Sequence, residues 1–333
     1  MTHCPPFHSE NRLWKSKFVL VFVWLMVGGV CFQPSSLFAQ IESPLPITID
    51  QQADRVTVST MAEGESKSLF TELLVDEYKP ILFPIMLNEV SLTRHFPIEE
   101  AKPGEAKDHP HHKSLWFAHG DVNGVDFWTE KARIKPTGTP TIDDNSVKFQ
   151  NQWLDGDKLI CTDQSTIRFF AGDSWRFIEY HVQLQASESD LTLGDTKEGT
   201  FAVRSHPALR LVDVNDQPVG QAINSQGVQG IPIWGKKARW VSYQGTIDDQ
   251  VFTLTIFDHR QNLRHPTTWQ AREYGLIAAN PFGLSYFQKA EKGAGDFLIP
   301  KNDSLSFHYG VLFHQGSLSP EQIDEWFNKF SPQ

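Results

Sequence analysis

The sequence predicts an all-β protein, a large antiparallel β-sandwich that carries a short C-terminal helix. Three observations support this fold class. Apolar and polar residues alternate in many short segments, turn-forming residues separate these segments, and helical periodicity is confined to the C-terminal end. The chain also contains 24 Phe and 10 Trp among 333 residues, and aromatic side chains favour β-strands.

The N-terminal segment is typical of a secretory signal peptide over residues 1–39. Basic residues up to Lys17 precede an apolar run over residues 18–30, and small or apolar residues lead to Ala39. The apolar run is about 13 residues long, which is shorter than the roughly 20 residues of a membrane-spanning helix. We therefore expect cleavage near Ala39, a periplasmic or secreted location, and no integral membrane span after processing.

The elements of the predicted sandwich follow one another over residues 40–333, without a recognisable linker or repeat. Residues 97–112 contain three prolines and a glycine and are expected to form a long surface loop. Residues 178–184, 252–256 and 305–313 alternate apolar and polar side chains, as strands with one solvated face do. We therefore expect one β-sandwich domain over residues 40–333.

The predicted C-terminal helix begins after Ser319, whose side chain can cap it, and Pro320 suits its first position. Apolar side chains then recur at the spacing of one helix face, at Ile323, Trp326, Phe327 and Phe330. We expect this apolar face to pack on the sandwich.

The charge balance and the cysteines limit the partners and the kinds of site. With 30 Lys and Arg against 40 Asp and Glu, the net charge is −10 at pH 7. Proteins that bind nucleic acids concentrate basic charge, so we expect no nucleic-acid partner. Cys161 is the one cysteine after residue 39, so we expect neither an internal disulfide nor a Cys-based zinc site.

The most informative segment for function is rich in histidine. Five of the 13 histidines fall close together, at His95, His109, His111, His112 and His119. Imidazole can serve as an acid, a base or a metal ligand near neutral pH. We therefore predict that His109, His111 and His119 are catalytic and that His112 binds substrate.

A metal site is an alternative role for the same segment. His109, His111, His119 and Asp121 offer nitrogen and oxygen ligands that zinc, copper or iron accept. Their spacing matches no specific metal motif, so a divalent metal stays one of three interpretations. A third interpretation leaves these histidines solvated on a loop.

Further candidate residues lie on both sides of this segment. Glu198 and Asp258 are the carboxylates that we expect to act with a catalytic histidine. Arginines would hold anionic or hydroxyl groups, and tryptophans would give a surface on which a sugar stacks. The remaining expected substrate-binding residues are Arg94, Asn123, Asp126, Trp128, Lys197, His259, Trp269, Arg272 and Asn280.

Several of these segments together resemble the PmoA-like family of secreted bacterial proteins. The segments are residues 93–97, 108–116, 119–128, 196–199, 234–238, 258–259 and 279–283. The resemblance covers about residues 75–315 and implies a methane-oxygenase label with copper or iron as the metal. Gln270 stands where the family's Trp-x-Ala-Arg motif is expected to have His. In architecture the chain also looks like the aldose-epimerase and galactose-mutarotase-like sandwiches, which bind sugars through His, Asp, Glu and Arg.

Three functions follow from these observations. The favoured one is a secreted carbohydrate-active enzyme, a lyase, hydrolase or epimerase, in which a histidine and a carboxylate move a proton. The alternatives are the metal-dependent oxygenase that the resemblance implies and a non-catalytic carbohydrate-binding module. The favoured function requires the candidate residues to converge in one place, in particular His109, His111, His119, Glu198, Asp258 and Arg272.

Overall fold

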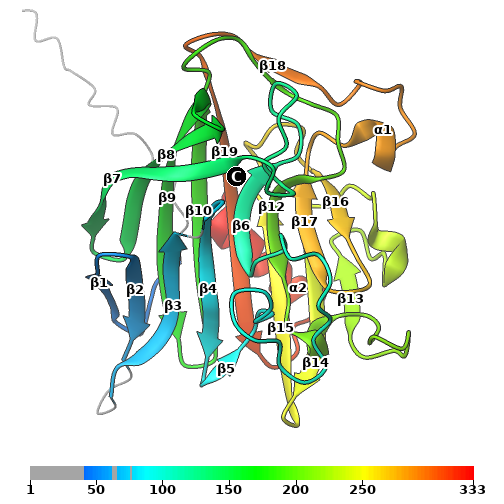
Figure 1. Cartoon of the computed structure of the whole chain (residues 1–333). Helices are drawn as coiled ribbons and strands as arrows, with labels where there is room; N and C mark the ends of the chain where they lie inside the picture. The colour runs from blue at the N-terminus through cyan, green and yellow to red at the C-terminus, as the bar shows by residue number, and fades with distance from the viewer. Residues whose placement is uncertain (1–40, 62–65, 76) are drawn as a thin grey trace, which may run out of the picture. The chain divides into compact units, whose positions relative to one another are not determined.

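The computed structural model describes residues 41–61, 66–75 and 77–333 of the chain. The predicted signal peptide and its cleavage site near Ala39 lie outside the described residues. All of the described residues fall within one compact unit. This unit is built mostly of antiparallel β-strands, which confirms the fold class predicted from the sequence (Figure 1).

The first sheet has nine strands in the order β1-β2-β3-β4-β6-β12-β17-β16, with the short β5 paired to β4. Every pairing in this sheet is antiparallel. Its strands are β1 (Ile47–Gln51), β2 (Arg55–Thr60), β3 (Ser68–Val75), β4 (Pro80–Leu87), β5 (Val90–Ser91), β6 (Leu115–His119), β12 (Gly199–Arg204), β16 (Thr268–Ala271) and β17 (Leu276–Asn280).

The second sheet has eight strands in the order β13-β14-β15-β19-β10-β9-β8-β7. Its strands are β7 (Arg133–Asp143), β8 (Ser146–Asp155), β9 (Lys158–Gly172), β10 (Trp175–Gln185), β13 (Gln221–Asn224), β14 (Trp240–Ile247), β15 (Gln250–Asp258) and β19 (Ser304–Gln315). The alternating segments found in the sequence lie in β10, β15 and β19. A separate pair joins β11 (Leu191–Leu193) to β18 (Phe297–Ile299).

Helices are few among the described residues. A single turn, α1, covers Leu284–Phe287, and short 3-10 turns cover Pro207–Leu209 and Ile231–Ile233. The longer α2 covers Pro320–Phe330 and begins at the predicted cap, where Ser319 and Gln322 exchange hydrogen bonds in a capping box. No helix within residues 41–61, 66–75 and 77–333 combines the length and the apolar character needed to cross a bilayer.

The aromatic side of α2 packs on the second sheet, as the sequence predicted. The ring centroid of Phe330 lies 5.9 Å from that of Phe177 in β10 and 6.2 Å from that of Phe257 in β15. Ile323 and Phe327 are also buried in this contact. The helix therefore covers the face of the second sheet that points away from the first sheet.

Aromatic side chains fill the space between the two sheets. Phe201 in β12 stacks on Tyr309 in β19, with ring centroids 4.6 Å apart and planes 7° apart. Phe117 in β6 contacts Phe307 in β19 at 5.7 Å. Because side chains alternate along a strand, the neighbours of Phe117 and Phe201 point to the opposite face of the first sheet. We call that opposite face the outer face of the nine-stranded sheet.

A substitution in the stacked pair of Phe201 and Tyr309 tests the described packing of the two sheets. We predict that Phe201→Ala lowers the free energy of unfolding by about 3–5 kcal/mol, because it leaves a cavity in the core. Val214 is 61% exposed, so Val214→Ala is expected to change it by less than about 0.5 kcal/mol. Urea unfolding followed by circular dichroism measures both values. A small effect of Phe201→Ala would contradict the described sheet packing.

Candidate functional site

The histidine-rich segment lies in the connection between β5 and β6, residues 92–114, which we call the His loop. His112 joins this loop to residues of the outer face. His112 stacks on Trp116 of β6, with ring centroids 5.6 Å apart, and its Nδ1 lies 3.5 Å from Nη1 of Arg204 at the end of β12. The site is therefore built from the His loop and from the outer-face residues of β6 and β12.

Arg94 fixes the shape of the His loop. Its side chain is 2% exposed. Its guanidinium donates to the carbonyl oxygens of Ala106 at 3.1 Å, Asp108 at 3.0 Å, His109 at 3.0 Å and His112 at 3.1 Å. The Nη1 and Nη2 donors of Arg94 are thus used within the loop, although its buried Nε has no partner among the described residues. This residue therefore positions the site, and the expected role in binding substrate does not agree with the structure.

Asp108 and His109 form the central polar pair of the loop. Asp108 Oδ2 lies 2.8 Å from His109 Nδ1, and Oδ1 accepts from Arg94 at 2.6 Å and from Arg204 at 2.8 Å. An ionised carboxylate only accepts, so Nδ1 of His109 carries the hydrogen, and Nε2 of the neutral ring holds the lone pair. The His109 side chain is 42% exposed, so the ring is accessible to a ligand.

The charges around Asp108 keep it ionised. Partial burial favours the protonated acid, but the hydrogen bond from His109 and the positive charges of Arg204 and Arg94 outweigh it. Together they hold the pKa of Asp108 well below its usual range. Burial and the charge of Arg94 lower the pKa of Arg204 to about 10, so Arg204 stays protonated at neutral pH.

Four aromatic rings lie nearly parallel through the loop. Tyr274, which precedes β17, stacks on His109 at 5.1 Å, His109 stacks on His112 at 4.7 Å, and His112 stacks on Trp116 at 5.6 Å. Trp128 closes the inner end, 5.1 Å from Trp116 and 5.8 Å from His112. The rings of His112, Trp116 and Trp128 are buried, whereas those of His109 and Tyr274 are partly exposed.

His111 stands edge-on to this row of rings, 4.4 Å from His112 between ring centroids. Burial and the charge of Lys79 lower the pKa of His111 to about 4, and Asp126 opposes this shift. His111 is therefore neutral at pH 7 and can accept a hydrogen bond or a proton. Trp128 is fully buried, so it can support the other rings but gives no open surface for a sugar to stack on.

Glu198 and Arg272 reach the same place from other strands. Glu198 precedes β12, and its Oε1 lies 3.5 Å from Nζ of Lys197. Arg272 pairs with Glu273 at 3.2 Å, and its Cζ lies 5.2 Å from the ring centroid of Tyr274. Burial raises the pKa of Tyr274 to about 12, and the charge of Glu198 contributes to this shift while Arg272 opposes it. Both side chains therefore lie near the ring that stacks on His109.

The structure thus brings eight of the predicted site residues together. Lys197, a ninth predicted residue, lies at the edge of this group. The eight are Arg94, His109, His111, His112, Asp126, Trp128, Glu198 and Arg272. The residues that the sequence interpretation did not single out as site residues are Asp108, Arg204 and Tyr274. The adjacency of Asp108 to His109 was a usable signal, but no local pattern marks Arg204 or Tyr274.

His119 lies on the other face of β6, inside the core. It is fully buried, and its Nε2 lies 2.9 Å from the carbonyl oxygen of Gly194. A Cβ atom on Gly199 would lie 2.4 Å from His119 Nδ1, so the strand can pass this ring only as glycine. The expected catalytic role of His119 therefore does not agree with the structure, because residues 116 and 119 point to opposite faces of the strand.

Asp258 and His259 belong to a second polar cluster beneath α2. Asp258 is fully buried and accepts from Asn262 at 2.8 Å and from the backbone N–H of Thr267 at 2.9 Å, and it contacts His265 Nδ1 at 2.7 Å. His259 stacks on His308, with ring centroids 4.5 Å apart. Asp258 ends β15 of the second sheet and His259 follows it, so the expected pairing of Asp258 with the histidines of the loop is wrong.

The remaining predicted residues tie turns and strands together. Trp269 is fully buried and donates from Nε1 to the carbonyl oxygen of Ala238 at 2.9 Å. Oδ1 of Asn280 accepts from the backbone N–H of Phe282 at 2.9 Å, and Oδ1 of Asn123 accepts from that of Thr192 at 2.7 Å. These hydrogen bonds give the three residues structural roles in place of the expected binding roles.

The candidate metal ligands do not come together. His109 and His111 lie in the His loop, His119 is in the core, and Asp121 accepts from the backbone N–H of Gly124 at 2.9 Å in a turn. In the described part of the chain, no three His, Cys, Asp or Glu side chains converge as a metal ion would require. The set His109, His111, His119 and Asp121 is therefore not a metal site in this structure.

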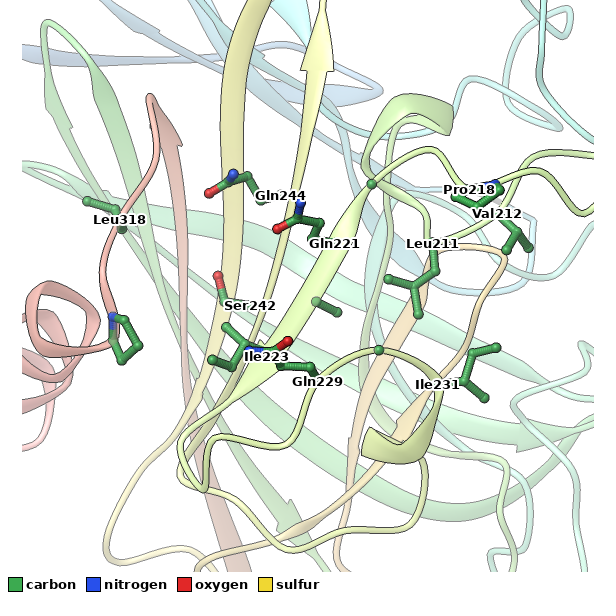
Figure 2. Close-up of a pocket in the computed structure, with 14 residues that line it drawn as sticks. Leu211, Val212, Pro218, Gln221, Ile223, Gln229, Ile231, Ser242, Gln244 and Leu318 are labelled. Carbon is green, nitrogen blue, oxygen red and sulfur yellow. The ribbon is translucent and has the colours of Figure 1, made fainter.

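A groove lies away from the histidines, beside β13 and β14. Figure 2 shows the side chains that line it, and its volume is about 520 Å³. Its polar groups include Gln221, Gln229, Ser242 and Gln244, and its described lining contains no ionisable side chain. The groove can therefore bind a neutral ligand but cannot supply an acid or a base.

Fold and site together define an all-β protein of two stacked sheets with a histidine–carboxylate pair on one outer face. The chain belongs to a family of unknown function, DUF6807, whose model matches residues 68–328. No curated protein is detectably similar to it in sequence.

Several solved structures are similar to this chain. A galactose mutarotase-like protein from Clostridium acetobutylicum has 8% identity over 82% of this chain and 99% of that chain, with a TM-score of 0.37. A polysaccharide lyase has 13% identity over 86% of this chain and 34% of that chain, with a TM-score of 0.35. A galactose mutarotase related enzyme from Lactobacillus acidophilus has 7% identity over 81% and 97%, with a TM-score of 0.34.

The buried histidines, His119 above all, are expected to make the free energy of unfolding depend on pH. Burial lowers the folded-state pKa of His119 to about 4, whereas an unfolded histidine has a pKa near 6.5. Between these values the unfolded chain binds the proton and the folded chain does not, so the free energy of unfolding falls as the pH drops from about 6.5 to 4. His119 alone contributes on the order of 3 kcal/mol to this fall.

Urea unfolding at pH 7 and pH 4.5 measures this dependence. His119→Gln keeps a donor for the Gly194 carbonyl but cannot titrate, so its stability is expected to depend less on pH than that of the wild type. Equal pH dependence in the two proteins would contradict the buried neutral imidazole.

Proposed function

We propose that this protein is an exported carbohydrate-active enzyme in which a histidine and a carboxylate move a proton on a sugar. The observation that carries the proposal is the contact between Asp108 and His109, with Oδ2 2.8 Å from Nδ1 and the carboxylate held by two buried arginines. Export rests on the N-terminal segment that we expect to be cleaved near Ala39. The intact mass of the protein recovered outside the cytoplasm tests that cleavage.

His109 is the proposed base. Its Nδ1–H is held by Asp108, so its Nε2 lone pair faces away from the carboxylate and can take a proton from a sugar C–H or O–H group. The ionised Asp108 then stabilises the imidazolium that forms. Arg94 and Arg204 help to hold the pKa of Asp108 well below its usual range, so the carboxylate is ionised at neutral pH.

Glu198 is the proposed second acid–base group, and Arg272 and Tyr274 are the proposed ligands of sugar hydroxyl groups. All three are partly exposed. Tyr274 stacks on His109, and Glu198 and Arg272 lie near the Tyr274 ring. His111, neutral at pH 7, can accept a hydrogen bond from a hydroxyl group. Epimerases, lyases and hydrolases all use positioned acid and base groups to move protons to or from the sugar or the attacking water.

The neutral groove of Figure 2 favours one second candidate, a carbohydrate-binding module without turnover. Its three glutamine side chains offer amide donors and acceptors but no acid or base.

Mass spectrometry of glycans incubated with the protein separates the candidates. A hydrolase adds water, a lyase splits the glycan without adding water, an epimerase keeps the mass while changing retention, and a binding module changes nothing. The oxygenase implied by the PmoA-like resemblance would show stoichiometric copper or iron in elemental analysis.

Substitution of His109 tests the proposed base. We expect His109→Gln to lower kcat by about 10²–10⁴, because a positioned general base contributes roughly that factor. His314→Gln is the matched control, since His314 lies on β19 in the other sheet, and it is expected to leave kcat unchanged. Circular dichroism verifies that both variants fold. Full turnover by His109→Gln would exclude the proposed role.

A further inference from the structure

A cavity of about 410 Å³ lies beside β4, β5, the end of β14 and the start of the His loop. Two histidines line it, His95 of the His loop and His206, which follows β12. The volume is within the range of small-molecule sites. Asp108 and His109 are not in its described lining, so it is separate from the site proposed above. We call it the His95–His206 cavity.

Backbone hydrogen bonds bring the two histidines to the same place. Thr93 and Ser205 form an antiparallel bridge, and the backbone N–H of His206 donates to the carbonyl oxygen of Leu92 at 2.9 Å. The two segments therefore lie side by side, although they are far apart in the sequence. The charge of His95 also contributes to the pKa of His206, so the two rings are close enough to interact.

His95 is oriented by a buried carboxylate. Oε1 of Glu105 lies 3.0 Å from Nδ1 of His95, and the Glu105 side chain is fully buried. Burial alone would raise the pKa of Glu105, but hydrogen bonds from the backbone N–H groups of His95 and Phe96 outweigh burial and lower it. The ionised carboxylate only accepts, so Nδ1 of His95 carries the hydrogen, and Nε2 of the neutral ring holds the lone pair.

His206 has the opposite tautomer. Its Nδ1 accepts from the backbone N–H of Ala208 at 3.1 Å and so caps the turn Pro207–Leu209. Nδ1 therefore carries no hydrogen, and Nε2 carries the hydrogen of the neutral ring. Burial lowers the pKa of His206 to about 4, with Glu105 opposing this shift and His95 adding to it, so the ring is neutral at pH 7.

The Nε2 atoms of both rings are accessible. Neither has a hydrogen-bond partner in the described part of the chain, and neither is among the buried polar atoms that lack one. Both residues line the cavity. The cavity therefore offers a ligand one nitrogen that accepts a proton and one that donates a hydrogen bond.

The other lining residues indicate the kind of ligand. The remaining ionisable ones are the exposed Glu89, Glu99 and Asp248, and the described lining contains no Lys or Arg. Carboxylates repel an anion and accept hydrogen bonds from hydroxyl groups. The cavity therefore favours a neutral, hydroxylated molecule. Apolar contacts are available from Leu69, Pro84, Met86, Val90 and Ile247.

We propose that the His95–His206 cavity is a second acid–base site, which takes a neutral hydroxyketone or hydroxyaldehyde and moves a proton at the carbon next to its carbonyl group. Nε2 of His95 takes the proton, the C–H electrons form a C=C bond, and the carbonyl oxygen becomes an enolate oxygen. The Nε2–H of His206 donates to this oxygen, as a neutral imidazole can. Return of the proton from His95 to the carbon restores the carbonyl group, so the step needs no oxidant or reductant.

Proton NMR in deuterium oxide measures this step directly. Dihydroxyacetone is expected to lose its C–H signal faster with the protein than in buffer, because the accessible Nε2 of His95 exchanges its proton with solvent. Dihydroxyacetone phosphate has the same carbonyl group. It is expected to exchange at least about tenfold more slowly than dihydroxyacetone, because the carboxylates repel its phosphate.

Two substitutions separate the roles of the histidines. His95→Gln keeps an N–H for Glu105 but removes the base, so it is expected to lower the exchange rate constant by about 10²–10⁴. His206→Ser keeps a capping side chain for the turn Pro207–Leu209 but removes the N–H donor, so a fall of about 10²–10³ is expected. His314→Gln is the matched control, since His314 lies on β19 in the second sheet, and it is expected to exchange as the wild type does.

Circular dichroism verifies that the three variants fold. Exchange no faster than in buffer, or equal rates in the wild type, His95→Gln and His206→Ser, would overturn the second acid–base site. Faster exchange of the phosphate would overturn the neutral substrate class. The site shares no residue with the Asp108–His109 pair, and glycan turnover that depends on His109 tests that pair alone. Each proposal can therefore fail while the other stands.

Discussion

The whole site depends on one carboxylate that neutralises two buried guanidinium groups. Arg94 and Arg204 come from segments about a hundred residues apart in sequence, and both donate to Oδ1 of Asp108. Two buried positive charges without a counter-charge would cost several kcal/mol each. The remaining oxygen of the same carboxylate orients His109. The contact that makes the His loop fold is thus also the contact that selects the tautomer of the exposed imidazole.

Much of the fold could be predicted because its signals are local. The alternation along β10, β15 and β19 and the cap at Ser319 each depend on neighbours a few residues away. The grouping of His109, His111 and His112 was predictable for the same reason. The strands and the cap are present in the structure as predicted, because period-two patterns and helix caps depend on local backbone geometry.

The roles of single residues were harder to predict, because they depend on contacts between distant segments. Arg94 was expected to bind substrate, but carbonyl groups of the folded loop occupy its Nη1 and Nη2 donors. His119 and Asp258 were expected near the loop, but one faces the core and the other lies on the second sheet. Tyr274 carries no sequence signal at all, since its place depends on how β16 and β17 turn beside β12. Spacing along a chain does not determine which face of a sheet a side chain occupies when the strand ends are uncertain.

The two glycines that flank Glu198 in space have a consequence for anyone who wishes to redesign the protein. A Cβ on Gly120 would lie 2.7 Å from Cβ of Glu198, and one on Gly199 would collide with the ring of His119. The backbone N–H of Gly120 also donates to the carbonyl oxygen of Glu198 at 2.7 Å. Libraries that vary this corner must therefore keep both glycines, which hold Glu198 in place, and can sample Thr196 and Lys197 beside it.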